Sequence, residues 1–214
     1  MKKSSLLLVA SMFTILMMNA QNEQEIPQEE TTPKTGAGTE YVLGLGFNAL
    51  NNSGAGFEDL TNSDHWAFGG VPVYLSVETN IASKWKAKAV LSHNYAKDGK
   101  VVDGSTILGE SEGGNDMGYL AFDVAANYYF LGAKTYEPYV SLGMGVSHFG
   151  DYSSQENPSN LVDPTDVFTY NVGLGLNVWF SDQWGLNLNT LGKWGVGSSS
   201  TNSHQTSLGV LYKI

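Results

Sequence analysis

Three segments near the C-terminal end, within residues 166–212, alternate apolar residues with small or polar ones. A period of two is that of a β-strand, because successive side chains of a strand point to opposite faces. One face of the first segment is apolar and aromatic: Phe168, Tyr170, Val172, Leu174, Leu176, Val178 and Phe180. The other face is mostly Gly, Asn and Thr, where a water-soluble sheet would carry charge. This contrast is typical of a transmembrane β-barrel, with lipid outside and a small polar interior.

The same alternation recurs along the chain and predicts eight strands. They are expected at residues 40–49, 71–80, 85–95, 117–130, 137–149, 166–180, 184–195 and 204–214. The connections alternate long and short, beginning and ending with a long one. Outer-membrane barrels have long extracellular loops, short periplasmic turns and an even number of strands. We therefore predict an all-β fold, an eight-stranded up-and-down antiparallel transmembrane β-barrel, over residues 40–214.

The N-terminal end has the pattern of a secretory signal peptide. Lys2 and Lys3 precede a short apolar stretch, and Ala20 is a small residue before an expected cleavage site. A membrane-anchor helix is the alternative, although the stretch is short for one. Residues 1–20 are thus predicted to be a signal peptide, and the acidic, Pro- and Gly-containing residues 21–39 a flexible periplasmic tail. The chain has no cysteine, which excludes disulfides and thiolate chemistry.

The balance of charges argues against nucleic acid as a partner. The formal net charge is −10, and the eleven basic residues are all lysines. Phosphate binding needs clustered cations, above all arginine, and this chain contains no arginine.

Five ionisable residues are predicted to point into the barrel: Glu78, Lys86, Lys88, Asp123 and Lys193. Glu78 and Lys86 flank one short turn, so they are expected to meet across neighbouring strands. The favoured interpretation is a salt-bridge network that fills the interior, because buried charges need partners. The alternative is a gate, in which an exchange of partners opens a narrow conduit. An eight-stranded barrel is roughly filled by its own side chains, which argues against a wide pore.

Aromatic residues fall at both ends of the predicted outer face, where they are expected to form interfacial girdles. Those at the short-turn end are Trp85, Phe130, Phe180, Trp184 and Tyr212, and those at the loop end are Tyr95, Phe168 and Trp194.

An enzyme sited at the barrel rim is an alternative, because histidines and serines occur near strand ends. The candidates are Ser147 with His148, and His204 with Ser207. Adjacent residues of a strand point to opposite faces, so Ser147 and His148 cannot meet. The acidic residues of the third long connection lack the spacing of an EF-hand and are interpreted as solvated surface. No catalytic residue, metal or cofactor is predicted.

Several of these segments together resemble a known family. They are VPVYLSVE at 71–78, MGYLAFDVAANYYF at 117–130, YEPYVSLGMGVSHFGD at 136–151, the run TYNVGLGLNVWFSDQWGLNLNTLGKWG at 169–195, and HQTSLGVLYKI at 204–214. The combination resembles the N-terminal membrane barrel of OmpA-like outer-membrane proteins, most closely those of Bacteroidetes. The resemblance implies a barrel in the outer membrane of a Gram-negative bacterium. OmpA continues into a peptidoglycan-binding domain and this sequence ends at Ile214, so peptidoglycan binding is not carried over.

The function predicted on this basis is a structural or interaction role, with acidic loops outside and a lumen largely filled by side chains. The alternatives are a narrow gated porin-like channel, a rim-sited lipid-modifying enzyme, and a secreted lipocalin-like binder. The last would place rows of Gly and Asn on the outside, which argues against it. The expected partners are outer-membrane lipid and lipopolysaccharide, the barrel assembly machinery, and another envelope protein.

Overall fold

The computed structural model describes residues 40–54, 62–102, 106–109, 117–131, 135–157, 159–197 and 202–214. The predicted signal peptide (1–20) and the predicted tail (21–39) lie outside these ranges, and both stay predictions. In the part of the chain that the structure describes, no helix is long and apolar enough to cross a membrane.

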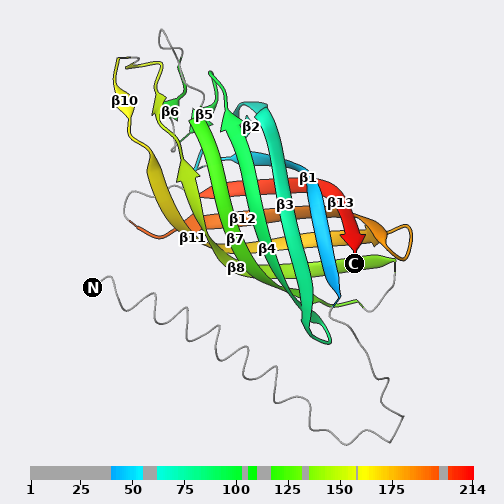
Figure 1. Cartoon of the computed structure of the whole chain (residues 1–214). Helices are drawn as coiled ribbons and strands as arrows, with labels where there is room; N and C mark the ends of the chain where they lie inside the picture. Colours follow the sequence, from blue (N-terminus) through cyan, green and yellow to red (C-terminus); the bar gives the residue numbers. More distant parts are fainter. Residues whose placement is uncertain are drawn as a thin grey trace, which may run out of the picture.

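Eight long strands form one closed barrel. They are β1 Tyr41–Asn51, β3 Gly69–Ala82, β4 Trp85–Ala96, β7 Met117–Tyr129, β8 Tyr136–Phe149, β11 Thr165–Trp179, β12 Trp184–Gly195 and β13 Ser203–Lys213. Each pairs antiparallel with the next, and β13 pairs with β1 to close the sheet (Figure 1). The predicted eight-stranded up-and-down barrel is confirmed, and the strand ends lie within two residues of the predicted ones.

Short elements at the loop end were not predicted. They are η2 Ser63–His65, β2 Trp66–Ala67, β5 Val101–Val102, β6 Thr106–Ile107, β9 Tyr152–Ser153 and β10 Leu161–Val162. β5 pairs with β6, and β9 with β10. The second and third long connections are also joined: Leu108 bridges Ser154, and the Gln155 amide donates to the Ile107 carbonyl at 2.9 Å. The described parts of these connections therefore form an ordered extension of the barrel, above its loop end in Figure 1.

The barrel is apolar outside and polar inside. Outward side chains such as Leu45, Leu75 and Leu174 are 54–59% exposed, whereas inward Asn127 and Asn187 are 0% exposed. This inverts the arrangement of a water-soluble protein, in which burial of apolar surface stabilises the fold. A hydrocarbon environment removes the conflict, because a closed barrel pairs its backbone polar groups internally and presents an apolar wall to lipid.

The outward positions of the eight strands carry no Asp, Glu, Lys or Arg except Asp166, which lies near the loop end of β11. Outward aromatic rings contact one another at both ends. The ring centroids of Trp184 and Tyr212 lie 4.7 Å apart at the short-turn end. Those of the stacked Tyr170 and Trp194 rings lie 5.6 Å apart at the loop end. Of the eight residues predicted to form girdles, six occupy outward strand positions, and two are exposed just beyond β7 and β11, Phe130 and Phe180. Their role at the membrane interface stays a prediction.

The orientation of the outer wall can be tested at Leu174, midway along β11. Leu174→Arg is expected to destabilise the folded barrel in lipid vesicles by about 2–4 kcal/mol, because it places a cation in hydrocarbon. Reversible denaturant unfolding followed by tryptophan fluorescence measures the change.

The matched control is Leu161→Arg in β10, where an equally exposed leucine lies beyond the barrel wall. It is expected to change stability by less than about 0.5 kcal/mol. Equal effects at the two positions would contradict a lipid-facing wall.

Candidate functional site

A buried ion pair lies in the loop-side half of the barrel interior. The Lys193 ammonium of β12 lies 2.9 Å from the Asp123 carboxylate of β7, and the two side chains are 0% and 4% exposed. Lys193 also donates to the Tyr119 hydroxyl at 2.9 Å, and the Asn171 amide donates to Asp123 at 2.7 Å. Each charge therefore has its opposite charge and a further hydrogen bond, which buried charges require to be tolerated.

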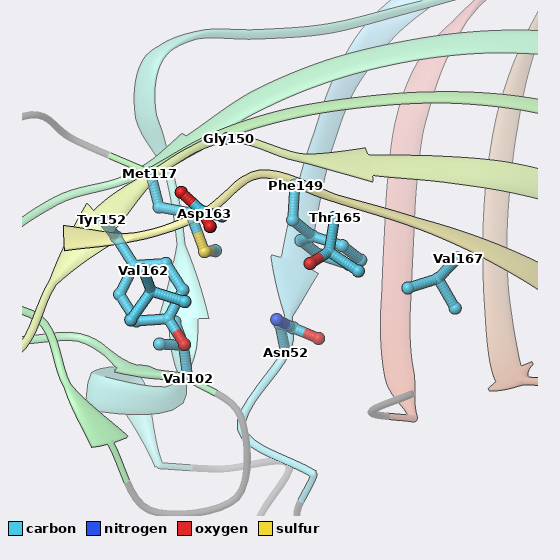
Figure 2. Close-up of a pocket in the computed structure, with 10 residues that line it drawn as sticks. All are labelled: Asn52, Val102, Met117, Phe149, Gly150, Tyr152, Val162, Asp163, Thr165 and Val167. Atoms are coloured by element: carbon cyan, nitrogen blue, oxygen red, sulfur yellow. The ribbon is translucent and has the colours of Figure 1, made fainter. Parts of the chain in front are cut away.

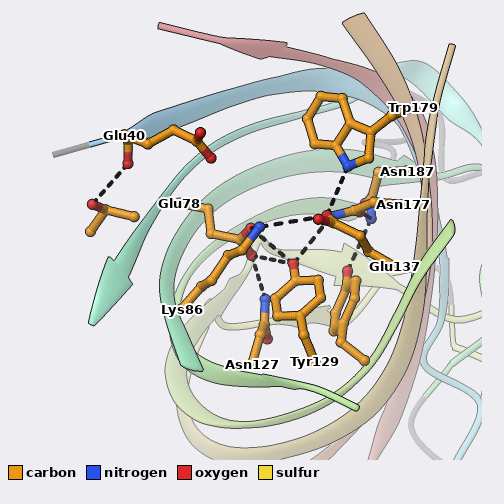
Figure 3. Close-up of polar contacts among 11 residues, drawn as sticks. Glu40, Glu78, Lys86, Asn127, Tyr129, Glu137, Asn177, Trp179 and Asn187 are labelled. Carbon is orange, nitrogen blue, oxygen red and sulfur yellow. Dashed lines mark hydrogen bonds and ion pairs between the residues drawn. The ribbon is translucent and has the colours of Figure 1, made fainter. Parts of the chain in front are cut away.

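A second network occupies the short-turn side of the interior (Figure 3). Glu78 accepts hydrogen bonds from the Asn127 amide at 2.7 Å and the Tyr129 hydroxyl at 2.8 Å. The Lys86 ammonium lies 3.7 Å from Glu78 and 3.5 Å from Glu137, so it bridges two carboxylates. The Trp179 indole donates to Glu137 at 2.8 Å. Lys86 of β4 thereby links its own strand to β3 and β8 inside the barrel.

Amides and tyrosines fill the space next to this network. Asn187 donates to Asn177 at 2.7 Å and to the Tyr139 hydroxyl at 3.0 Å, and Asn177 donates to the Tyr129 hydroxyl at 3.1 Å. Gly175 makes room for one of these rings, because a Cβ at that position would overlap Tyr139. This inward glycine thus accommodates the large side chain that faces it on the neighbouring strand, since Gly175 of β11 pairs with Tyr139 of β8.

The loop end of the lumen is closed by apolar side chains rather than polar ones. This loop-end cap is a cluster of buried residues: Leu50, Ala67, Ala96, Val102, Leu108, Met117, Tyr119, Ala121, Phe149, Tyr152 and Val167. Met117, Tyr119 and Ala121 alternate in β7 with the same parity as Asp123, so the inward direction of these three residues was readable from the sequence. The predicted polar interior thus has an apolar cluster at its loop end, where residues from the long connections pack against the strand ends.

The five lumen residues predicted from sequence fall into separate groups. Glu78 lies against Lys86, and Asp123 lies against Lys193. The Lys88 ammonium lies 5.9 Å from the centroid of the Tyr139 ring. Glu137 and the inward tyrosines belong to the same networks but were not singled out. The parity of their strands would have found them, since Glu137 shares a face with the inward residues of β8.

The residues considered for a rim enzyme are not brought together. Ser147 points inward, is 0% exposed and lies 3.3 Å from the Tyr119 hydroxyl. His148 points outward and pairs with Asp166 at 2.7 Å, and both side chains are at least half exposed. His204 and Ser207 occupy opposite faces of β13. Among the described residues, no three His, Cys, Asp or Glu side chains are grouped so as to hold a metal ion.

A closed eight-stranded antiparallel barrel with an apolar wall and a polar, hydrogen-bonded interior defines the class of small outer-membrane barrels. No family model matches the chain, and no curated protein matches its sequence.

Solved structures share this fold. One is the crystal structure of Ail, the attachment invasion locus protein of Yersinia pestis, in complex with the heparin analogue sucrose octasulfate. It has a TM-score of 0.52 at 13% identity and covers 82% of this chain and 99% of that chain. Neisserial surface protein A (NspA) has a TM-score of 0.54 at 12% identity, covering 82% and 97%. The outer membrane protein OprG from Pseudomonas aeruginosa has a TM-score of 0.53 at 14% identity, covering 82% and 96%. The predicted resemblance to outer-membrane barrels of the OmpA-like type is confirmed at the level of the fold.

The coupling of the buried pair can be measured with a double-mutant cycle. Lys193→Met and Asp123→Asn are each expected to destabilise the barrel by about 3–5 kcal/mol, because each leaves its partner's charge buried without an opposite charge. The double variant is expected to lose less than the sum of the two, since neither charge then remains. Denaturant unfolding in vesicles measures all four proteins.

The control is His148→Gln, which breaks the exposed pair with Asp166 on the outer surface. It is expected to cost under about 1 kcal/mol, because exposed pairs are screened by solvent. Strictly additive losses for Lys193 and Asp123 would show that the two residues do not act as a pair.

Proposed function

We propose that this protein is a Gram-negative outer-membrane barrel with a closed lumen and a structural or interaction role, and that its functional surface is the loop end. Its apolar outward wall and its aromatic ends support placement in a membrane. The structural neighbours are outer-membrane proteins, which supports the same location.

The orientation follows from the ends of the barrel. The Ile214 amide donates to the Tyr41 carbonyl at 2.8 Å, so both ends of the described barrel lie at the short-turn end. In outer-membrane barrels this end faces the periplasm, and the long connections face the outside. The loop end would then meet lipopolysaccharide and any envelope partner, while the barrel wall meets lipid and, during insertion, the assembly machinery.

The observation that supports a closed lumen is a series of side-chain contacts across it among the described residues. The short-turn network, the Lys193–Asp123 pair and the loop-end cap succeed one another along the barrel. Opening a conduit past the Lys193–Asp123 pair, the middle layer of this series, would separate two buried charges at a cost of several kcal/mol. A narrow gated channel is therefore the second candidate, supported by the presence of an ion pair across the lumen.

The ligand of a structural neighbour is not transferred. Ail was crystallised with a sulfated heparin analogue. Each of the first three long connections of this chain carries more acidic than basic residues. A soluble sulfated polyanion would be repelled by such a surface, so the soluble partners that we favour are neutral or positively charged.

Conductance of the refolded barrel in a planar bilayer tests the proposal. The wild-type protein is expected to give no discrete current steps, with insertion verified by its heat-modifiable mobility on gels. Lys193→Ala and Asp123→Ala, measured alongside, report on the middle layer. Reproducible wild-type steps whose size or open time changes in these variants would contradict the closed lumen and establish the gated channel.

A further inference from the structure

A small cavity of about 80 Å³ lies at the loop end, between the ends of the barrel strands and the segment around β10 (Figure 2). The residues that decide its chemistry are Asn52, Met117, Phe149, Tyr152, Asp163 and Thr165. Met117, Phe149 and Tyr152 also belong to the loop-end cap, so the cavity is a pocket within that core. It is separate from the polar networks of the lumen.

Two acceptors on the cavity wall bear on the ligand, the Asn52 Oδ1 and the Asp163 carboxylate. The Asn52 side chain is 7% exposed, and its Oδ1 has no hydrogen-bond partner among the described residues. A buried acceptor left without a donor costs about 1–3 kcal/mol, so a ligand that donates to this oxygen, once the Asn52 amide turns it toward the cavity, gains that amount. Asp163 adds a carboxylate to the same wall, and none of the lining residues is Lys, Arg or His. The wall therefore favours a ligand with a positive charge and N–H donors.

The rest of the wall is apolar and aromatic. Phe149 and Tyr152 contribute rings, and Met117, which is 1% exposed, contributes a thioether. Such walls accept alkyl chains, and aromatic faces also attract ammonium groups. The volume holds about five to eight water-sized groups. A ligand that matches both the polar and the apolar part of the cavity wall is short, with one cationic end and one alkyl end.

We propose that this cavity binds a short-chain primary alkylamine in its ammonium form, with the ammonium at Asn52 and Asp163 and the alkyl chain against Met117 and Phe149. Val162 and Asp163 are exposed, so the ligand would enter from the loop side. The net negative charge of the neighbouring connections favours a cation approaching from that side.

Methionine methyl NMR of the full barrel in lipid nanodiscs tests the proposal. Beyond residue 20 the chain has two methionines, Met117 in the cavity wall and Met144 on the outward face of β8. Met144 therefore reports any partitioning of the probe into lipid. The probes are n-butylammonium, its neutral analogue 1-butanol and its anionic analogue butyrate. We expect n-butylammonium to shift Met117 saturably without a saturable shift at Met144, 1-butanol to bind at least about tenfold more weakly, and butyrate to leave Met117 unchanged.

Charge variants separate a specific contact from the general field of the loops. Asp163→Asn is expected to weaken n-butylammonium binding about tenfold, the loss of one charge-assisted hydrogen bond. Asp166→Asn removes an equal charge from a neighbouring residue outside the cavity and is expected to change the affinity by less than about twofold. Asn52→Leu, which removes the unpaired acceptor, is expected to weaken binding by a similar factor to Asp163→Asn.

Three results would overturn the proposal: an unmoved Met117 with n-butylammonium, 1-butanol binding as tightly as the amine, or equal losses for Asp163→Asn and Asp166→Asn. The folded state of each variant is checked by the unchanged Met144 signal. None of these outcomes depends on conductance, so the closed-lumen proposal stands or falls separately.

Discussion

The seam between β1 and β13 is the constraint on which the rest of the structure depends. The first and last barrel strands pair along ten consecutive positions, from Val42 with Lys213 to Asn51 with His204. In hydrocarbon, each unpaired backbone N–H or C=O costs several kcal/mol, so a sheet can cross a membrane only when it has no free edge. Closure fixes the direction of every alternating side chain. The apolar side chains must face outward, and the polar side chains must form hydrogen bonds and ion pairs with one another inside.

The interior meets this demand with few charges and many amides and hydroxyls. Lys193 and Asp123 are paired, and Lys86 bridges Glu78 and Glu137. Tyrosine rings occupy the space that inward glycines leave free, as Tyr139 does beside Gly175. The loop-end cap completes the filling with apolar groups. This filling is the basis of our proposal that the lumen is closed and that the functional surface is the loop end.

The sequence predicted the barrel well, because a period of two and alternating connection lengths depend only on neighbouring residues. It also predicted that Glu78 meets Lys86, since a short turn determines which residues face each other. It did not predict that Lys193 would be the partner of Asp123, because that contact crosses the lumen between strands that are not neighbours. Nor did it predict the cap or the cavity. Both depend on how separate long connections pack together, for which strand periodicity carries no information.

Thiol accessibility along the lumen tests the central claim of a filled interior most directly, and the natural chain has no cysteine to interfere. Single cysteines would replace Ser141 and Ser147, which are 5% and 0% exposed inside the barrel, and Asn160, which is exposed at the loop end. A charged, membrane-impermeant thiol reagent applied to both sides of sealed vesicles is expected to label the Asn160→Cys variant rapidly. Ser141→Cys and Ser147→Cys are expected to react at least about a hundredfold more slowly, because reagent and water are excluded from a packed interior. Labelling of the two lumen positions at a rate close to that of the loop position would contradict the account.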